Sequence, residues 1–266
     1  MSEQKICLTI AGLDPSGGAG IIADIKTFTA FDCFATAAIA SITFQNTLGV
    51  FGAVHQSGET IRGQVEPVLA DFDVAAVKTG MLPTVEVIEE TARLLRSNNL
   101  QNVVVDPVVR STCGFDLIDD AALNALIDML FPLSAVVTPN IQEAERITGE
   151  KIETEADIER AARNIQSKGA RNVLIKGGHF ETDTFIKKKA RDYLFIGGEK
   201  TVFEAAYIDT TATHGTGCTL AAAIAANLAL GKDLKEAVSI SKAFVNEAIR
   251  TAPKLGHGHS PINIRR

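Results

Sequence analysis

A glycine-rich segment near the end of the chain carries the strongest chemical signal. Residues 213–219 read THGTGCT and lie directly before an alanine-rich stretch. Two glycines allow the backbone to turn sharply and to approach a ligand closely, and successive backbone N–H groups at a helix start attract anions. Such a site stabilises the charge on a phosphoryl group in transfer. A glycine-rich turn in which a threonine caps a helix explains the same residues equally well.

Cys218 stands where that expected helix begins. A thiol at a helix N-terminus can have a lowered pKa, and such a thiol could take a proton from a substrate hydroxyl. The alternative is that Cys218 packs as a small buried residue with no chemical role.

A second glycine-rich segment, AGLDPSGGAG at residues 11–20, follows the first apolar run. It permits a small ligand to approach the backbone closely. The chain has neither GxGxxG nor GxxxxGK[ST], so dinucleotide-binding and P-loop interpretations lack their fingerprints. Asp24 lies one turn into the helix expected after this loop, where it could orient a polar ligand or serve as a first-turn carboxylate favoured by the helix dipole.

Carboxylates and a lysine follow other apolar runs. Asn140 and Glu143 have the spacing of a capping box, which alone explains both residues. Glu143 could instead support hydrated Mg²⁺ on ATP phosphates, and Asp106, at the end of NVVVD, is a second candidate for that role. Lys176 ends the apolar run VLIK and could either reach a phosphate or extend its charged end into solvent.

Two further residues could recognise a flat ring. Gln45 can both donate and accept hydrogen bonds, which suits the edge of an aminopyrimidine. Met81 could pack on the face of a ring. Both lie in segments that we expect to follow strands, FQNT at 44–47 and KTGM at 78–81. Either residue could equally be an ordinary loop or core residue.

The elements that must position these residues are short apolar runs that alternate with amphipathic stretches. We expect strands at residues 5–12, 35–43, 75–80, 102–106, 135–138 and 172–177. We expect helices at residues 20–31, 84–97, 121–130, 142–148, 155–168, 219–230 and 234–252, and an antiparallel hairpin within 182–208. This order predicts an α/β fold with a mainly parallel sheet, as one domain over residues 1–266. Ligands bind beyond the carboxyl ends of the strands in such sheets.

Composition argues against several other classes of protein. The net charge of −6 and the pI of about 5.4 do not suit a general nucleic-acid binder, which would carry a basic surface. The basic run at 187–191 is short and typical of a solvated loop or edge. The four cysteines form no CxxC pair, so we expect no structural zinc site and a reduced, cytoplasmic protein. No stretch suits a signal peptide or a membrane span.

The motifs occur together in an order that resembles one family. From about Ile6 to Pro261 the sequence is similar to hydroxymethylpyrimidine/phosphomethylpyrimidine kinases, a branch of the ribokinase-like superfamily. The resemblance rests on TIAGLDPSGGAGIIADIKTF, QNTLGV, KTGML, VVVDPV, TPNIQEA, LIKGGH and THGTGCTLAAAIA. It implies a ribokinase-like three-layer α/β/α sandwich with a mainly parallel central sheet. It also implies transfer of the γ-phosphoryl group of ATP, with Mg²⁺, to 4-amino-5-hydroxymethyl-2-methylpyrimidine and then to its monophosphate, in thiamine biosynthesis.

The resemblance assigns roles to residues. The family's pyrimidine pocket falls on Gly12, Asp24, Gln45, Met81 and Val108. Its Mg-ATP side falls on Asp106, Asn140, Glu143, Lys176, His214 and Lys242, with Asp106 and Glu143 toward the metal. The catalytic group comprises Lys176, an anion hole at Gly215, Thr216 and Gly217, and Cys218 as the candidate base, at a position where most ribokinase-like enzymes have an aspartate.

Two departures from the family pattern bear on details. Leu13 replaces the small polar residue that usually follows TIAG, and Thr112 and Cys113 replace a usual lysine and serine, so that Arg110 is the candidate substitute for the lysine. The nearest alternative function is a pyridoxine or pyridoxal kinase of the same fold, and the other is a non-catalytic pyrimidine-binding protein. We expect a homodimer, which is common in the family.

Overall fold

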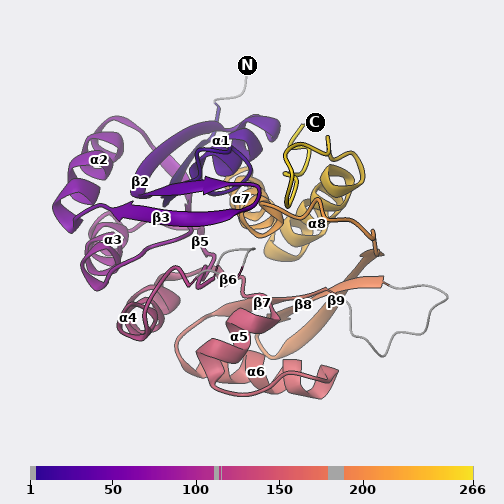
Figure 1. Cartoon of the computed structure of the whole chain (residues 1–266). Helices are drawn as coiled ribbons and strands as arrows, with labels where there is room; N and C mark the ends of the chain where they lie inside the picture. The colour runs from indigo at the N-terminus through magenta and orange to yellow at the C-terminus, as the bar shows by residue number, and fades with distance from the viewer. Residues whose placement is uncertain (1–3, 111–113, 115, 179–188, 266) are drawn as a thin grey trace.

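A central sheet with helices on both faces organises the molecule (Figure 1). The structure is a computed structural model, which describes residues 4–110, 114, 116–178 and 189–265. Within those residues the strands are β1 (Ile6–Leu13), β2 (Phe34–Asn46), β3 (Gly49–His55), β4 (Val74–Thr79), β5 (Val103–Val105), β6 (Val136–Val137), β7 (Asn172–Gly178), β8 (Lys189–Ile196) and β9 (Glu199–Ala206).

The strand order is β3-β2-β1-β4-β5-β6-β7-β8-β9. Neighbours from β2 to β7 are parallel, whereas β3, β8 and β9 each pair antiparallel with the strand before them. The chain runs from β1 outward to β2 and β3 and then returns to β4 on the other side of β1. The carboxyl ends of β1 and β4 therefore border the crevice in which open α/β sheets bind ligands.

The helices separate into two layers. They are α1 (Gly20–Ala30), α2 (Gly58–Asp71), α3 (Val85–Ser97), α4 (Asp120–Leu130), α5 (Ile141–Thr148), α6 (Glu155–Ser167), α7 (Thr216–Ala229) and α8 (Leu234–Arg250). Helices α1, α7 and α8 pack on one face of the sheet and α2 to α6 on the other, each layer with its own apolar core. None of these described helices is long and apolar enough to cross a membrane.

Side chains that alternate along a strand contribute to both apolar cores. In β5, Val103 and Val105 join the core under α2 to α6, whereas Val104 joins the core under α1, α7 and α8. Successive side chains of a strand point to opposite faces, and a strand covered on both faces is therefore apolar throughout. The three-layer α/β/α sandwich that the sequence predicts is confirmed.

Two elements were not predicted from the sequence. Strand β3 lies at the sheet edge and is partly exposed, so it lacks the continuous apolar run of a central strand. Helix α2 contains Pro67 and buries only Gly58, Ile61 and Val65, which makes a weak apolar stripe. Strand β2 also continues to Asn46, so that Gln45 lies inside a strand and not in the loop that we expected.

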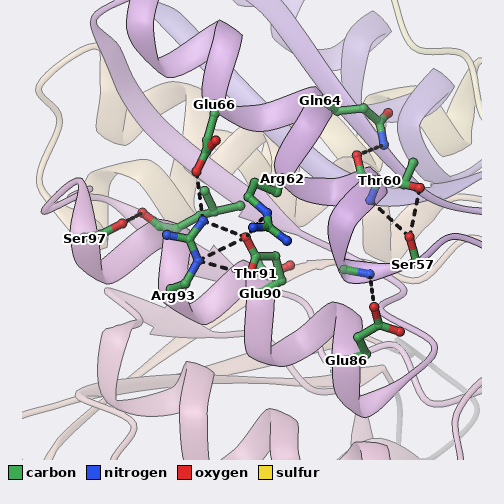
Figure 2. Close-up of polar contacts among 12 residues, drawn as sticks. Ser57, Thr60, Arg62, Gln64, Glu66, Glu86, Glu90, Thr91, Arg93 and Ser97 are labelled. Atoms are coloured by element: carbon green, nitrogen blue, oxygen red, sulfur yellow. Dashed lines mark hydrogen bonds and ion pairs between the residues drawn. The ribbon is translucent and has the colours of Figure 1, made fainter.

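Helices α2 and α3 are linked on their outer side by charged residues (Figure 2). Arg93 of α3 lies 2.9 Å from Glu66 of α2 and 2.7 Å from Glu90. The backbone N–H of Gly58, at the start of α2, donates to Glu86 at 2.8 Å. Because Arg93 and Glu66 are exposed, their ion pair contributes little to stability. The network therefore marks where α2 and α3 meet, and its residues do not line the cavity described below.

Candidate active site

A cavity of about 1030 Å³ opens at the carboxyl ends of the parallel strands. Its wall is formed by residues that follow β1, β4, β5 and β6, as expected for a sheet of this kind. Every site residue predicted from the sequence lines this cavity except Asp24. Those that line it are Gly12, Gln45, Met81, Asp106, Val108, Asn140, Glu143, Lys176, His214, Gly215, Thr216, Gly217, Cys218 and Lys242.

One part of the wall has the character of a ring pocket. A Cβ atom at Gly12 would lie 3.1 Å from the sulfur of Met81, so glycine is what lets Met81 pack against the end of β1. Thr43 Oγ1 lies 3.1 Å from Gln45 Oε1, and this contact sets the orientation of the glutamine amide. Gln45 Nε2 is thereby placed 3.5 Å from His214 Nε2. An apolar surface and an oriented amide suit a substituted aromatic ring.

Asp24 lies behind the cavity wall and not on it. Its side chain is fully buried, and its Oδ2 atom lies 2.8 Å from Lys78 Nζ and accepts a hydrogen bond from Thr9 Oγ1 at 2.6 Å. Its Oδ1 atom has no hydrogen-bond partner among the described residues. Lys78 lines the cavity in its place. The motif KTGM predicts that Met81 belongs to this part of the wall, but it predicts no role for Lys78.

Opposite charges determine how this pair titrates. Burial raises the pKa of Asp24, and the positive charge of Lys78 counteracts that rise. Although burial favours the neutral amine, the charges of Asp24 and Asp106 hold the pKa of Lys78 above its ordinary value. The lysine is therefore a fixed positive charge beside the cavity.

The turn before α7 has the geometry of an anion site. Gly215 has a φ of +87°, a left-handed conformation that favours glycine, and the helix begins at Thr216. A Cβ atom at Gly215 would lie 1.8 Å from the carbonyl oxygen of Gly18, and one at Gly217 would lie 3.2 Å from Lys176 Nζ. The helix thus starts earlier than the residue 219 that we expected. Its first backbone N–H groups are free of intrahelical partners by geometry and can bind an anion.

Lys176 lies between two carboxylates on the same side of the cavity. Its Nζ atom is 2.9 Å from Asp106 Oδ1 and 3.6 Å from Glu143 Oε2. Asp106 Oδ1 also accepts a hydrogen bond from Thr138 Oγ1 at 3.0 Å. The predicted capping box is present as well, because Asn140 and Glu143 exchange hydrogen bonds of 2.7 and 2.8 Å. Glu143 therefore caps α5 and faces the cavity at once.

The pKa values of this cluster follow from burial and charge. Burial raises the pKa of Glu143 to about 7, although the charge of Lys176 acts in the opposite direction. The charges of Asp106 and Glu143 hold the pKa of Lys176 above its ordinary value despite burial. One ammonium group thus neutralises part of the charge of two buried carboxylates.

The donors around Lys176 suit a cation that is shared with phosphates. Among the described residues, no group of three or more His, Cys, Asp or Glu side chains is arranged to hold a metal ion. Mg²⁺ is commonly bound by one or two carboxylates together with water and substrate phosphates. Asp106 and Glu143 fit that mode, because they lie on one wall of the cavity that also contains the anion-binding turn.

Lys242 is held by a residue that the sequence did not single out. Its Nζ atom lies 2.6 Å from Asp192 Oδ2, and both side chains are largely buried. Asp192 belongs to β8 and lines the cavity together with Lys242. No local motif marks Asp192, because its partner Lys242 lies on α8, 50 positions away. Arg110, the candidate substitute for the missing lysine, also lines the cavity and lies 2.8 Å from Asp116. Thr112 and Cys113 lie outside the described residues.

Cys218 is half-buried in the first turn of α7 and lines the cavity. We expected that a helix start could lower the pKa of its thiol. Burial instead raises the pKa of Cys218 to about 11, while the charge of Lys78 and a hydrogen bond from the backbone of Gly20 oppose that rise. The resting side chain is therefore a thiol at neutral pH.

The residue before the anion-binding turn is anchored to the loop after β1. His214 Nε2 lies 2.7 Å from Asp14 Oδ2, and both side chains are buried. Asp14 sits in the glycine-rich segment that the sequence marked, but we had assigned it no role.

The chain is similar to known proteins over nearly its whole length. A family model described as phosphomethylpyrimidine kinase matches residues 14–263. A hydroxymethylpyrimidine/phosphomethylpyrimidine kinase of Bacillus subtilis is 43% identical over 263 residues, which cover 99% of this chain and 95% of that protein.

Solved structures are similar over nearly the whole chain. The phosphomethylpyrimidine kinase of Clostridium difficile has a TM-score of 0.81 and 41% identity, over 92% of this chain and 100% of that chain. The pyridoxal kinase of Staphylococcus aureus, solved with AMP-PCP and pyridoxal, has a TM-score of 0.89 and 34% identity, over 99% of this chain and 94% of that chain.

Proposed function

The chain belongs to the phosphomethylpyrimidine kinase family, and from this membership and the cavity we infer its reaction. It is a kinase that transfers the γ-phosphoryl group of ATP to 4-amino-5-hydroxymethyl-2-methylpyrimidine and then to the resulting monophosphate. The product is the pyrimidine diphosphate used in thiamine biosynthesis. Its small-molecule substrates and its acidic composition support a cytoplasmic location and do not suggest nucleic acid or membrane as partners.

One observation carries this inference. A single cavity has an oriented amide and an apolar surface, at Gln45 and Met81. The same cavity also has a second set of groups that suit phosphates, namely the start of α7, Lys176 and Lys242. A pyrimidine-binding protein without kinase activity would have no need for the second set. The cavity of about 1030 Å³ also has room for two ligands, since a typical small-molecule site occupies roughly 300–1,000 Å³.

The proposed roles follow from these positions. Gly12, Gln45, Met81 and Val108 hold the ring, and Asp24 acts through Lys78 behind the wall. The backbone of residues 215–217 and Lys176 stabilise the charge that develops on the transferred group. Asn140, His214 and Lys242 contribute to the nucleotide side. Cys218 lines the same cavity from the first turn of α7 and is the candidate base for the acceptor hydroxyl, a role that requires its thiolate form.

Mg²⁺ would be held by ATP phosphates together with Asp106 and Glu143, and it would neutralise charge on the phosphates. Lys176 already lies between these two carboxylates, so it keeps them in place before nucleotide binds. Much of the catalysis then comes from positioning and charge neutralisation, because a loose phosphoryl-transfer transition state asks little covalent chemistry of the protein.

Turnover with separate substrates tests the assignment. Purified protein with Mg²⁺ and ATP should consume ATP with hydroxymethylpyrimidine and with its monophosphate, and mass spectrometry should detect the diphosphate. Pyridoxal is the second candidate substrate, because a pyridoxal kinase has a TM-score of 0.89 to this chain. Pyridoxal phosphate as the sole product would replace the pyrimidine assignment, and the absence of turnover with all three compounds would contradict it.

We also propose that the chain forms a homodimer through the hairpin of β2 and β3. This hairpin exposes large apolar side chains, namely Ile42, Phe44, Leu48, Phe51 and Val54, of which Phe51 is 69% exposed. Ile42 pairs with Val54 across the hairpin, and β3 is an edge strand. An exposed apolar edge strand promotes association unless it is covered. A second copy would cover the same patch on both subunits.

The oligomeric state of a Phe51→Glu variant tests this surface. Light scattering should give a dimer mass for the wild type and a monomer mass for Phe51→Glu. Leu230→Glu is the matched control, because Leu230 is an exposed apolar residue at the end of α7 and outside the hairpin. A dimer that persists in Phe51→Glu, or a monomeric wild type, would contradict the proposal.

A further inference from the structure

Asp14 and His214 form a buried pair although they lie 200 positions apart in the chain. Asp14 follows β1, and His214 directly precedes the anion-binding turn. His214 Nε2 lies 2.7 Å from Asp14 Oδ2, with 7% and 3% of the two side chains exposed. A charge-assisted hydrogen bond of this length in a buried site is strong and directional.

The carboxylate of Asp14 is itself fixed by its own loop. Ser16 donates to Asp14 Oδ1 from its backbone N–H at 2.8 Å and from its hydroxyl at 2.7 Å. The backbone N–H of Ala19 donates to Oδ2 at 2.9 Å. Against the effect of burial, the hydrogen bonds from His214 and Ser16 hold the pKa of Asp14 below its ordinary value. The carboxylate therefore presents a fixed acceptor to the imidazole.

The two loops touch at their glycines as well. A Cβ atom at Gly18 would lie 2.3 Å from His214 Cδ2, and a Cβ atom at Gly215 would lie 1.8 Å from the carbonyl oxygen of Gly18. Neither position has room for a side chain. The loop of residues 14–19 and the anion-binding turn are therefore in backbone contact, and the Asp14–His214 pair lies beside that contact.

The same imidazole reaches the ring pocket. His214 Nε2 lies 3.5 Å from Gln45 Nε2, in the cavity that Gln45, Asp14 and His214 all line. Because His214 Nε2 donates to the Asp14 carboxylate, its approach to the Gln45 amide nitrogen is a packing contact and not a hydrogen bond. Side-chain contacts thus run from Gln45, through His214, to the loop after β1. These residues come from β2, from the loop after β1 and from the segment before α7.

We propose that Asp14 is a positioning residue, which acts through His214 to hold the ring pocket in register with the anion-binding turn. The inference rests on the proposed kinase function and adds a residue to it. Asp14 touches no reacting atom. It sets the distance between the acceptor hydroxyl, held with the ring, and the phosphoryl group, held at the turn. A misplacement of about 1 Å can lower a rate on the order of 100-fold.

A double-mutant cycle tests this unit. Asp14→Ala, His214→Ala and the double variant are compared with the wild type for kcat, for KM of pyrimidine and ATP, and for AMP-PCP affinity. We expect each single variant to lower kcat on the order of 30- to 100-fold. In Asp14→Ala, AMP-PCP affinity should change by less than about threefold, because Asp14 has no assigned role at the nucleotide. The double variant should be no slower than the slower single variant, because residues that act as one unit are not additive.

Glu66→Ala is the matched control, because it removes a side-chain contact between two elements, with Arg93 at 2.9 Å, and Glu66 does not line the cavity. It should keep kcat within about threefold of the wild type. His214→Gln, whose amide can still donate toward Asp14, should recover part of the activity lost in His214→Ala.

Two results would overturn the proposal. They are multiplicative losses in the double variant, and single variants whose kcat equals that of the wild type. A measurement without turnover distinguishes a loss of folding from a loss of positioning. The wild type should show an exchange-protected imidazole N–H proton resonance, and both single variants should lose it. Thermal unfolding of both variants should remain cooperative. The same comparisons can be made with pyridoxal as acceptor, so a failed pyrimidine assignment would be seen in the wild type and would not be confused with a failed role of Asp14.

Discussion

Lys78 Nζ lies 2.8 Å from Asp24 Oδ2, and neither side chain is accessible to solvent. Burying two opposite charges costs free energy that their attraction only partly offsets, so an ion pair of this kind is weak evidence of a contribution to stability. Its position argues for function, because Lys78 lines the cavity and carries its charge toward Cys218. The effect of this pair on the free energy of unfolding can therefore be measured separately from its effect on Cys218.

Replacing Lys78 with methionine should destabilise the protein. The substitution leaves Asp24 buried without its partner, and removing one member of a buried pair typically costs about 3–5 kcal/mol. The double variant Lys78→Met with Asp24→Asn should recover most of that loss, because it removes both charges and keeps the volume. Urea unfolding at pH 7.5 measures the free energies. A single variant as stable as the wild type would show that the pair is not buried in solution.

The same lysine should control the reactivity of Cys218. The pKa of Cys218 is raised to about 11 by burial, and the charge of Lys78 counteracts that rise. Alkylation of Cys218 by iodoacetamide should therefore accelerate as the pH rises toward 11 in the wild type. Because the charge of Asp24 raises the pKa of Cys218, the effect of Lys78 is measured against Asp24→Asn. Alkylation should be slower at pH 9 in the Lys78→Met, Asp24→Asn double variant than in Asp24→Asn.

Peptide mapping distinguishes Cys218 from the other thiols. Cys7 and Cys33 are buried and should remain unmodified in folded protein, which provides an internal control. Lys78→Arg keeps the positive charge and should retain more of the wild-type rate than Lys78→Met. Equal rates in Asp24→Asn and the uncharged double variant would remove Lys78 from any role at the thiol.

The sequence predicted the residues that line the cavity better than the buried residues behind the cavity wall. Motifs such as THGTGC and TPNIQE are local, because a glycine turn or a capping box forms within a few residues. Almost all of the residues predicted from them line one cavity. Asp24 differs because its surroundings depend on a lysine 54 positions away, and no spacing within one motif encodes that contact.

The missed elements have a related physical cause. Strand β3 is stabilised by pairing with β2 at the sheet edge, and helix α2 by packing on α3, so neither carries a strong periodic pattern of its own. Asp14 and Asp192 were missed because their partners, His214 and Lys242, lie on distant elements. The expectation that the helix start lowers the pKa of Cys218 was wrong for the same reason. Burial by the surrounding fold raises this pKa by more than the local surroundings lower it.

Stability without ligands should depend on pH through Glu143. Burial raises the pKa of this side chain from 4.5 to about 7. The folded state therefore binds the proton more tightly than the unfolded state. The stabilising contribution is fully present below pH 4.5 and is lost as the pH rises through 7. A shift of this size corresponds to about 3 kcal/mol at most.

Glu143→Gln provides the comparison, because glutamine can also complete a capping box but does not titrate. Urea unfolding without Mg²⁺ or nucleotide should show that the wild type loses stability relative to Glu143→Gln between pH 4.5 and 8. Parallel pH profiles of the two proteins would contradict the raised pKa.

Substitution of Cys218 should separate proton removal from positioning in the transfer step. General base catalysis typically contributes about 10²–10⁴-fold, so Cys218→Ala should lower kcat by a factor in that range if Cys218 first loses its own proton and the thiolate then takes the acceptor proton. The KM for ATP should change little, because we propose that residues 215–217 and Lys176, and not Cys218, hold the phosphates. Cys218→Ser preserves size and a polar atom but is a far weaker acid. A serine variant as slow as the alanine variant supports proton transfer through sulfur, measured as diphosphate formed over time. A serine variant near the wild-type rate would instead assign Cys218 a role in holding the acceptor hydroxyl, with the proton leaving late in a loose transition state.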